Sequence, residues 1–306
     1  MDSYDDYSNL HWTSIVITCS SGSVRDGVEE ECKRLSKGGL LPSHDLLLVL
    51  DDPQHEVEVS KQEQVFHAAP GVGSGGATIN AILVAMERLS AQHNHTTIYT
   101  PSKSSYFSYL HNIHINNISS ELVHSSRILV LHHGRLLVHS PGGTAFLRLS
   151  PEQTFVPPSA TTTPPTLLQH AIWMTTKMSS KSKTGVWVMS LDTFLPYSCI
   201  VCPPDTDGVD GAVVCTVAAP LEHATHHGVV IANNEQDINK MEYRMPLDEL
   251  RKVCSEGVGA VISGLVFLSS SLTEKLLGLH TVPPLDRCTY YGMDSGVPPL
   301  QVSFFT

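Results

Sequence analysis

Basic residues are scarce in this chain, and they do not gather into a patch. The 306 residues include 19 Lys and Arg against 30 Asp and Glu, which gives a formal net charge of -11. A surface that binds double-stranded nucleic acid needs clustered cations to neutralise the phosphates. The composition therefore argues against nucleic acid as the main partner.

The chain also lacks an apolar run of the length that a membrane-spanning helix needs, which is about 20 residues. The longest candidate covers only residues 259–268. The sequence begins MDSYDDYSNLHW, which is polar and acidic and does not resemble a signal peptide. We therefore expect a cytoplasmic protein without a membrane association.

Cysteines are few, and their spacing excludes two common uses. Among the seven, only Cys199 and Cys202 form a close pair. A zinc ribbon would need a second such pair, and a secreted disulfide framework usually shows an even number of cysteines in a shorter chain. We expect reduced thiols that are mostly buried.

Short apolar segments rich in β-branched residues alternate with segments that suit helices. This order is typical of an α/β fold with a mostly parallel, layered sheet. We expect one domain over residues 1–306, with a loop rich in Pro, Ser and Thr at 151–166. The predicted strands cover residues 13–18, 46–50, 127–131, 186–189, 212–217 and 228–232, the segment 260–268 is apolar, and the predicted helices cover 27–37, 79–89 and 272–279.

The stretch PGVGSGGATIN, at residues 70–80, matches two phosphate-binding patterns incompletely. Gly71, Gly73 and Gly76 spell G-x-G-x-x-G, but no strand directly precedes them, as a dinucleotide fingerprint requires. The same residues fit a P-loop except that Ala77 stands at the position of the lysine that contacts the β- and γ-phosphates. A dinucleotide fold and a P-loop NTPase are therefore both disfavoured.

A third interpretation of this stretch keeps only glycine amides that lead into a helix N-terminus, which is a favourable place for an anion. On this interpretation Thr78 caps the helix, and the phosphate-binding residues are Gly71, Gly73, Ser74, Gly75, Gly76 and Thr78. The alternative is a glycine turn that only allows close packing.

Five stretches, in the same order along the chain, resemble the L-fucose kinases. They are TSIVITC at 13–19, GSGGATINAILVA at 73–85, GVWVMSLD at 185–192, HHGVVI at 226–231, and SGLVFLSS at 263–270 running on to PPLDRCTYYGMDSG at 283–296. Those kinases carry an N-terminal region related to GDP-fucose pyrophosphorylase, and the resemblance of this chain is to that region.

The resemblance implies a Rossmann-like fold of the nucleotide-diphospho-sugar-transferase type. It also implies binding of L-fucose or fucose 1-phosphate, and of GTP or ATP with Mg²⁺. Complete family members phosphorylate L-fucose with ATP in a C-terminal kinase domain of the GHMP type, for GDP-fucose salvage. This sequence has no such domain, so we expect the front part of a longer protein, incomplete at its C-terminus and inactive alone as a kinase. The alternatives are a competent fucose-1-phosphate guanylyltransferase and a non-catalytic regulatory or scaffold domain.

The chain departs from its active pyrophosphorylase relatives after the strand predicted at 127–131. Those relatives carry a Gly-Gly-x-Ser-x-Arg element and then Gly-Lys, whereas here His133-Gly134-Arg135 is followed by Gly143-Thr144. Gly134 is the remaining candidate for phosphate contact. Arg135, or Arg148, is the candidate for the missing cation, which nucleotidyl transfer needs to stabilise developing charge.

Two aspartates and one histidine complete the predicted site. Asp192 follows a predicted strand, and Asp294 lies in GMDSG; either carboxylate could hold Mg²⁺, or could instead serve a cap or turn. His227 could contact a sugar hydroxyl or phosphate, or could be packed at a strand start. A zinc site at His223, His226 and His227 is disfavoured because the chain has no H-E-x-x-H motif and its 17 histidines make chance neighbours common.

Overall fold

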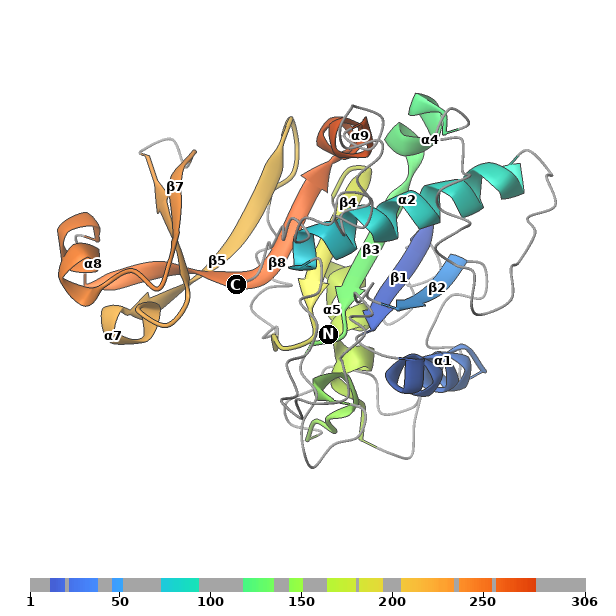
Figure 1. Cartoon of the computed structure of the whole chain (residues 1–306), viewed down its shortest axis with the longest axis horizontal. Coiled ribbons are helices and arrows are strands. Elements are labelled where there is room, and N and C mark those ends of the chain that lie inside the picture. Colours follow the sequence, from blue (N-terminus) through green and yellow to red (C-terminus); the bar gives the residue numbers. More distant parts are fainter. Residues whose placement is uncertain are drawn as a thin grey trace, which may run out of the picture.

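One mixed sheet of eight strands forms the centre of the computed structural model, with the strand order β2-β1-β3-β4-β8-β6-β7 and with β5 paired to β8 (Figure 1). The structure describes residues 12–19, 22–37, 46–51, 73–93, 118–134, 143–150, 164–179, 182–194, 205–233, 237–254 and 257–278. No helix in these ranges is long and apolar enough to cross a membrane.

Four neighbouring strands are parallel, as the sequence predicts. They are β2 (Leu46–Asp51), β1 (Ser14–Cys19), β3 (Arg127–His132) and β4 (Gly185–Ser190). Their apolar runs are continuous because helices cover both faces of this half of the sheet. All six residues of β1, for example, are buried.

The other half of the sheet is antiparallel, so the prediction of a mostly parallel sheet is right only for the first four strands. Strand β8 (Val258–Ser269) runs antiparallel to β4, β5 (Ala212–Pro220) and β6 (Gly228–Ala232), and β7 (Ile238–Tyr243) runs antiparallel to β6. Antiparallel neighbours need only a short connection, and β6 and β7 are joined by one that is too short to hold a crossover helix.

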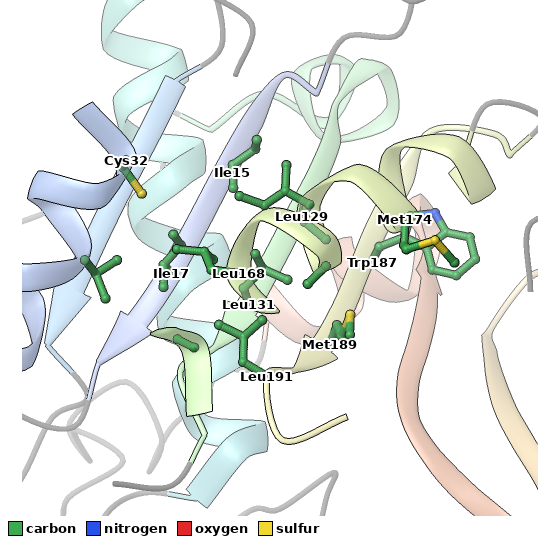
Figure 2. Packing of buried hydrophobic residues seen from close by; sticks show 14 of the residues in the cluster. Ile15, Ile17, Cys32, Leu129, Leu131, Leu168, Met174, Trp187, Met189 and Leu191 are labelled. Carbon is green, nitrogen blue, oxygen red and sulfur yellow. The ribbon is translucent and has the colours of Figure 1, made fainter. Parts of the chain in front are cut away.

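Two apolar layers enclose the parallel strands. On one face, α1 (Gly22–Lys37) and α5 (Leu167–Met178) pack against side chains such as Ile17, Leu131 and Trp187 (Figure 2). On the other face, α2 (Gly73–His93), α4 (Ser120–Ser125) and α9 (Ser270–Gly278) pack against the alternate strand residues, such as Val16 and Val130. The result is a three-layer α/β/α arrangement.

A smaller unit projects from the sheet on the side away from α1 (Figure 1). We call it the arm: β6, β7, α7 (Leu221–Ala224), α8 (Leu247–Val253), and residues 216–220 of β5 with 258–262 of β8. It has its own apolar cluster, which includes Leu221, Val229 and Leu250. The arm begins where β8 is irregular, next to Gly264, whose φ is +81°.

Helices α1 and α2 both begin earlier than predicted, α1 at Gly22 instead of residue 27. The sequence places the start of α2 after Thr78, but this helix begins at Gly73 and contains Gly75 and Gly76, both buried. Glycine lowers helix propensity by about 1 kcal/mol relative to Ala, and packing on both sides outweighs that cost here. Helices α4, α5, α7 and α8 and strand β7 were not predicted.

The described cysteines are thiols, as predicted, but only half of them are buried. Cys19 and Cys32 are buried, while Cys215 and Cys254 are partly exposed. Burial raises the pKa of the Cys32 thiol to about 12. Cys199 and Cys202 lie outside the described residues.

Candidate functional site

The carboxyl ends of β1, β3 and β4 meet at one edge of the sheet. The residues that follow β3 and β4 extend the parallel hydrogen bonding: the His133 amide donates to the Thr18 carbonyl at 3.0 Å, and the Leu191 amide donates to the His132 carbonyl at 2.8 Å. In open α/β sheets this edge is where ligands usually bind. The loops after β3 and β4 are therefore held side by side in a favourable place.

Gly134 and Asp192, two of the predicted site residues, come together here through Thr144. The Thr144 hydroxyl, at the start of a 3₁₀ turn (Thr144–Phe146), donates to Asp192 Oδ1 at 3.0 Å. Gly134 has a φ of +82°, and a Cβ on it would lie 2.5 Å from Thr144 Oγ1 and 2.6 Å from Asp192 Oδ1. The three residues form what we call the Gly134–Asp192 cluster, and its role in binding stays a prediction.

Asp192 is the described carboxylate best placed to hold a cation. Its side chain is exposed just after the carboxyl end of β4, and its backbone amide lies 3.3 Å from Ser190 Oγ. Mg²⁺ is often bound through one or two carboxylates together with substrate phosphates. No group of three or more His, Cys, Asp or Glu side chains that could hold a metal occurs in the described ranges. The second predicted carboxylate, Asp294, lies outside them.

Thr78 is not the N-cap that the sequence predicts, because it lies within α2 and is fully buried. Its hydroxyl lies 2.7 Å from the Ser74 carbonyl oxygen, one helical turn earlier, and 2.8 Å from His132 Nε2. The other imidazole nitrogen, His132 Nδ1, lies 2.8 Å from Thr18 Oγ1. Thr78 therefore joins α2 to β3 and β1 instead of facing a ligand. Gly71 lies outside the described residues, and Gly73 and Ser74 remain at the start of the helix.

The hydrogen bonds around His132 fit one neutral tautomer. If the Thr78 hydroxyl donates to the Ser74 carbonyl, it accepts from the Nε2–H of His132, whose Nδ1 then accepts from the Thr18 hydroxyl. Burial lowers the pKa of His132 to about 4, which agrees with a neutral ring. The sequence interpretation missed this residue, although a polar residue at the end of the apolar strand RILVLH was a usable signal.

His227 lies between α7 and β6 of the arm. Its side chain is exposed, its amide donates to the Ala224 carbonyl, and its own carbonyl accepts from the Arg244 amide at 3.2 Å. The alternative of a packed histidine at a strand start is therefore wrong. The structure shows no contact that links the imidazole of His227 to the Gly134–Asp192 cluster among the residues it describes, and its contact with a sugar or phosphate stays a prediction.

Of the two arginines suggested as substitutes for the missing cation, the structure describes only Arg148. Arg135 lies outside the described residues. Arg148 points its guanidinium at the Pro164 carbonyl oxygen, at 2.6 Å. The hydrogen bond from Arg34 is the main cause that lowers the pKa of the Glu31 carboxyl, and the charge of Arg148 adds to it. Arg148 thus has contacts within the fold near α1.

An aromatic pair next to Asp192 was also missed. Phe194 follows two residues after Asp192 and is 43% exposed. Its ring stacks on the imidazole of His170, which is fully buried in α5, with the ring centroids 4.8 Å apart and the planes 6° from parallel. Nothing in the sequence brings these two residues together, because only the packing of α5 against β4 does so.

Comparison with known families matches residues 120–306 to the fucose pyrophosphorylase domain. A comparison with curated proteins gives no match. The matched range contains β3, β4 and the Gly134–Asp192 cluster, whereas β1, α1, β2 and α2 precede it.

Proposed function

Because the chain belongs to the fucose pyrophosphorylase domain family, we propose that it binds fucose 1-phosphate and a guanine nucleotide at the carboxyl edge of β1, β3 and β4. The family match supports a fucose-related sugar-nucleotide function. The particular ligands, and the reaction between them, are our proposal.

The observation that carries the proposal is the Gly134–Asp192 cluster. It combines a positive-φ glycine, a hydroxyl and an exposed carboxylate at an edge where α/β sheets bind nucleotides. The missing Cβ at Gly134 lets Thr144 Oγ1 and Asp192 Oδ1 approach its backbone closely, which keeps the carboxylate at this edge. The carboxylate is the described group that would hold Mg²⁺, which offsets phosphate charge when it is bound.

The proposed reaction is guanylyl transfer. A phosphate oxygen of fucose 1-phosphate attacks the α-phosphorus of GTP, the bond from that phosphorus to the β-phosphate bridging oxygen breaks, and pyrophosphate leaves. The chain's part is to align the two phosphates and to hold Asp192 in one orientation, which the hydrogen bond from Thr144 does.

A second candidate is binding without transfer, as the sugar-nucleotide-binding part of an L-fucose kinase whose ATP-dependent step lies in a GHMP domain. Two observations favour it: Thr144 follows Gly143 where active pyrophosphorylase relatives have a lysine, and Arg148 contacts the Pro164 carbonyl near α1. On this candidate the purified chain binds GDP-fucose but makes neither GDP-fucose nor fucose 1-phosphate.

Calorimetric titration of the purified chain with GDP-fucose, GTP and ATP, with and without Mg²⁺, tests the proposal. We expect guanine-selective binding that Mg²⁺ strengthens. Asp192→Asn keeps an acceptor for Thr144 but removes the charge, and should weaken Mg²⁺-dependent binding about tenfold or more. Asp248→Asn, at an exposed position of α8, is the matched control and should leave binding unchanged.

Turnover separates the two candidates. Release of pyrophosphate from GTP and fucose 1-phosphate, lost in Asp192→Asn, supports guanylyl transfer. Binding without release supports the second candidate, and formation of fucose 1-phosphate from ATP and L-fucose by this chain contradicts it. If the folded chain binds none of the nucleotides, both candidates are wrong.

A further inference from the structure

We propose that Phe194, supported by His170, is a platform on which the pyranose ring of the sugar phosphate stacks. This inference rests on the proposed function, because it assigns the sugar-binding part of the same site. It names a specificity-determining residue outside the phosphate-binding cluster.

The Phe194 ring is stacked on a buried partner, and Phe194 is partly exposed. The buried imidazole of His170 lies parallel to one face of the Phe194 ring, at a centroid distance of 4.8 Å. Phe194 as a whole remains 43% exposed. An exposed aromatic ring fixed from behind can bind a second ring with little loss of conformational entropy, because its own rotamer is already restricted.

The position of Phe194 relative to Asp192 favours a sugar ring over a nucleotide base. Two residues of chain span at most about 7 Å between Cα atoms, so the backbone of Phe194 lies within that distance of the backbone of Asp192. In a sugar 1-phosphate the pyranose carbon bears the phosphate directly. In a nucleotide, a whole ribose separates the base from its phosphate. This difference favours the pyranose over the base as the ring that stacks on Phe194.

The positions of Phe194 and α2 on opposite faces of the sheet also favour separate places for the sugar and the nucleotide. Phe194 leans toward α5, on the same face as α1, whereas the start of α2 lies on the opposite face, where Thr78 contacts His132. The Gly134–Asp192 cluster lies between them at the strand ends. On this assignment the nucleotide lies on the α2 side of the cluster and the sugar on the Phe194 side.

The chemistry of a 6-deoxyhexose suits this platform. Its C–H groups and its methyl group give the ring an apolar face that packs on an aromatic ring, while its hydroxyls need hydrogen-bond acceptors. Asp192 Oδ1 already accepts from Thr144, and a carboxylate has further acceptor capacity. An apolar platform beside a carboxylate thus matches both sides of such a sugar.

Titration of the full chain with fucose 1-phosphate, GDP and GDP-fucose tests the platform. We expect Phe194→Ala to weaken fucose 1-phosphate and GDP-fucose about five- to tenfold and to leave GDP unchanged, because an aromatic stacking contact is modest in strength. Phe194→Tyr should retain binding, and Phe194→Leu, which is apolar but not flat, should lose part of it. Tyr243→Ala is the matched control, because Tyr243 is an aromatic residue of the arm with 45% exposure.

Each outcome decides the inference. Equal weakening of GDP and GDP-fucose in Phe194→Ala would assign the platform to the base and overturn the proposal. No weakening, with wild-type binding of GDP-fucose intact, would overturn it while sparing the proposed function. If the wild-type chain binds none of the three ligands, the proposed function fails and this inference fails with it. Melting temperatures of all variants close to that of the wild type exclude unfolding as the cause.

Discussion

Gly134 is the residue whose replacement the site tolerates least. Its φ of +82° lies in a region that L-residues rarely adopt, and the space where a Cβ would stand is occupied by Thr144 Oγ1 and Asp192 Oδ1. Backbone conformation and close approach therefore both require glycine. The sequence already suggested Gly134 for phosphate contact, but it did not suggest that the neighbour of this glycine would be Asp192.

Gly134→Ala should lower the free energy of unfolding by about 2–4 kcal/mol, from the left-handed strain together with overpacking. Gly208→Ala is the matched control, since Gly208 also has a positive φ, of +73°, but nothing lies within 4 Å of the added Cβ. It should cost only the strain, about 1 kcal/mol. Urea unfolding of both variants measures the difference, and equal losses would show that the crowding at Gly134 has no energetic effect.

At the scale of elements, one buried histidine of β3 adds hydrogen bonds to the apolar packing of α2 on the sheet. Thr78 on α2 and Thr18 on β1 each lie 2.8 Å from an imidazole nitrogen of His132. The sequence predicted the α2 stripe and the β3 strand, and both exist. It could not predict that Thr78 would point at the sheet, because that depends on where the helix begins.

His132 should make stability depend on pH. Its pKa is about 4 in the folded chain against an ordinary value of 6.5, so between these values the unfolded chain holds a proton that the folded chain lacks. The free energy of unfolding due to His132 is therefore fully present above pH 6.5 and is lost as the pH falls toward 4. Glu87 acts in the opposite direction, since burial raises the pKa of its carboxyl to about 8.

Comparing the wild type with the variant His132→Gln cancels the effect of Glu87 on the pH dependence of stability, because both proteins contain Glu87. Between pH 5 and pH 7.5, wild type should gain about 1–2 kcal/mol of unfolding free energy relative to the variant. Urea unfolding at the two pH values measures this gain. Parallel pH profiles for the two proteins would contradict the assignment of a neutral, buried His132.

At the scale of the whole molecule, the three-layer body and the arm differ in how much core they have. The body has two extended apolar clusters, one on each face of the sheet, whereas the arm has one small cluster. Five of the six residues of β7 are exposed. A unit with few buried contacts opens locally at a lower free energy than the body does.

Hydrogen exchange followed by mass spectrometry should show this difference. Amides of β6 and β7 should exchange at least about tenfold faster than those of β1, β3 and β4, because local opening of the arm does not require the body to unfold. Exchange at the same rate in both regions would indicate that the arm and the body unfold as one cooperative unit.

The sequence by itself determined the parallel strands and the family resemblance. It also determined that helices form at α1 and α9, near the two ends of the described region. Buried strands such as β1 and β3 occur in the sequence as unbroken apolar runs. The local pattern of residues is sufficient to detect such runs. The sequence also named Gly134 and Asp192, because glycines and carboxylates that follow such strands are recognisable along the chain.

Only the tertiary structure decided the direction of β5, β6 and β8, the start of α2, and which polar residues meet. A strand's sequence does not record which neighbour it will pair with, since pairing depends on the whole sheet. Likewise, packing alone brings three pairs of residues into contact that are far apart in the sequence. They are Thr78 with His132, Thr144 with Asp192, and His170 with Phe194, which are 54, 48 and 24 positions apart. Their chemistry is therefore a property of the fold and not of any local motif.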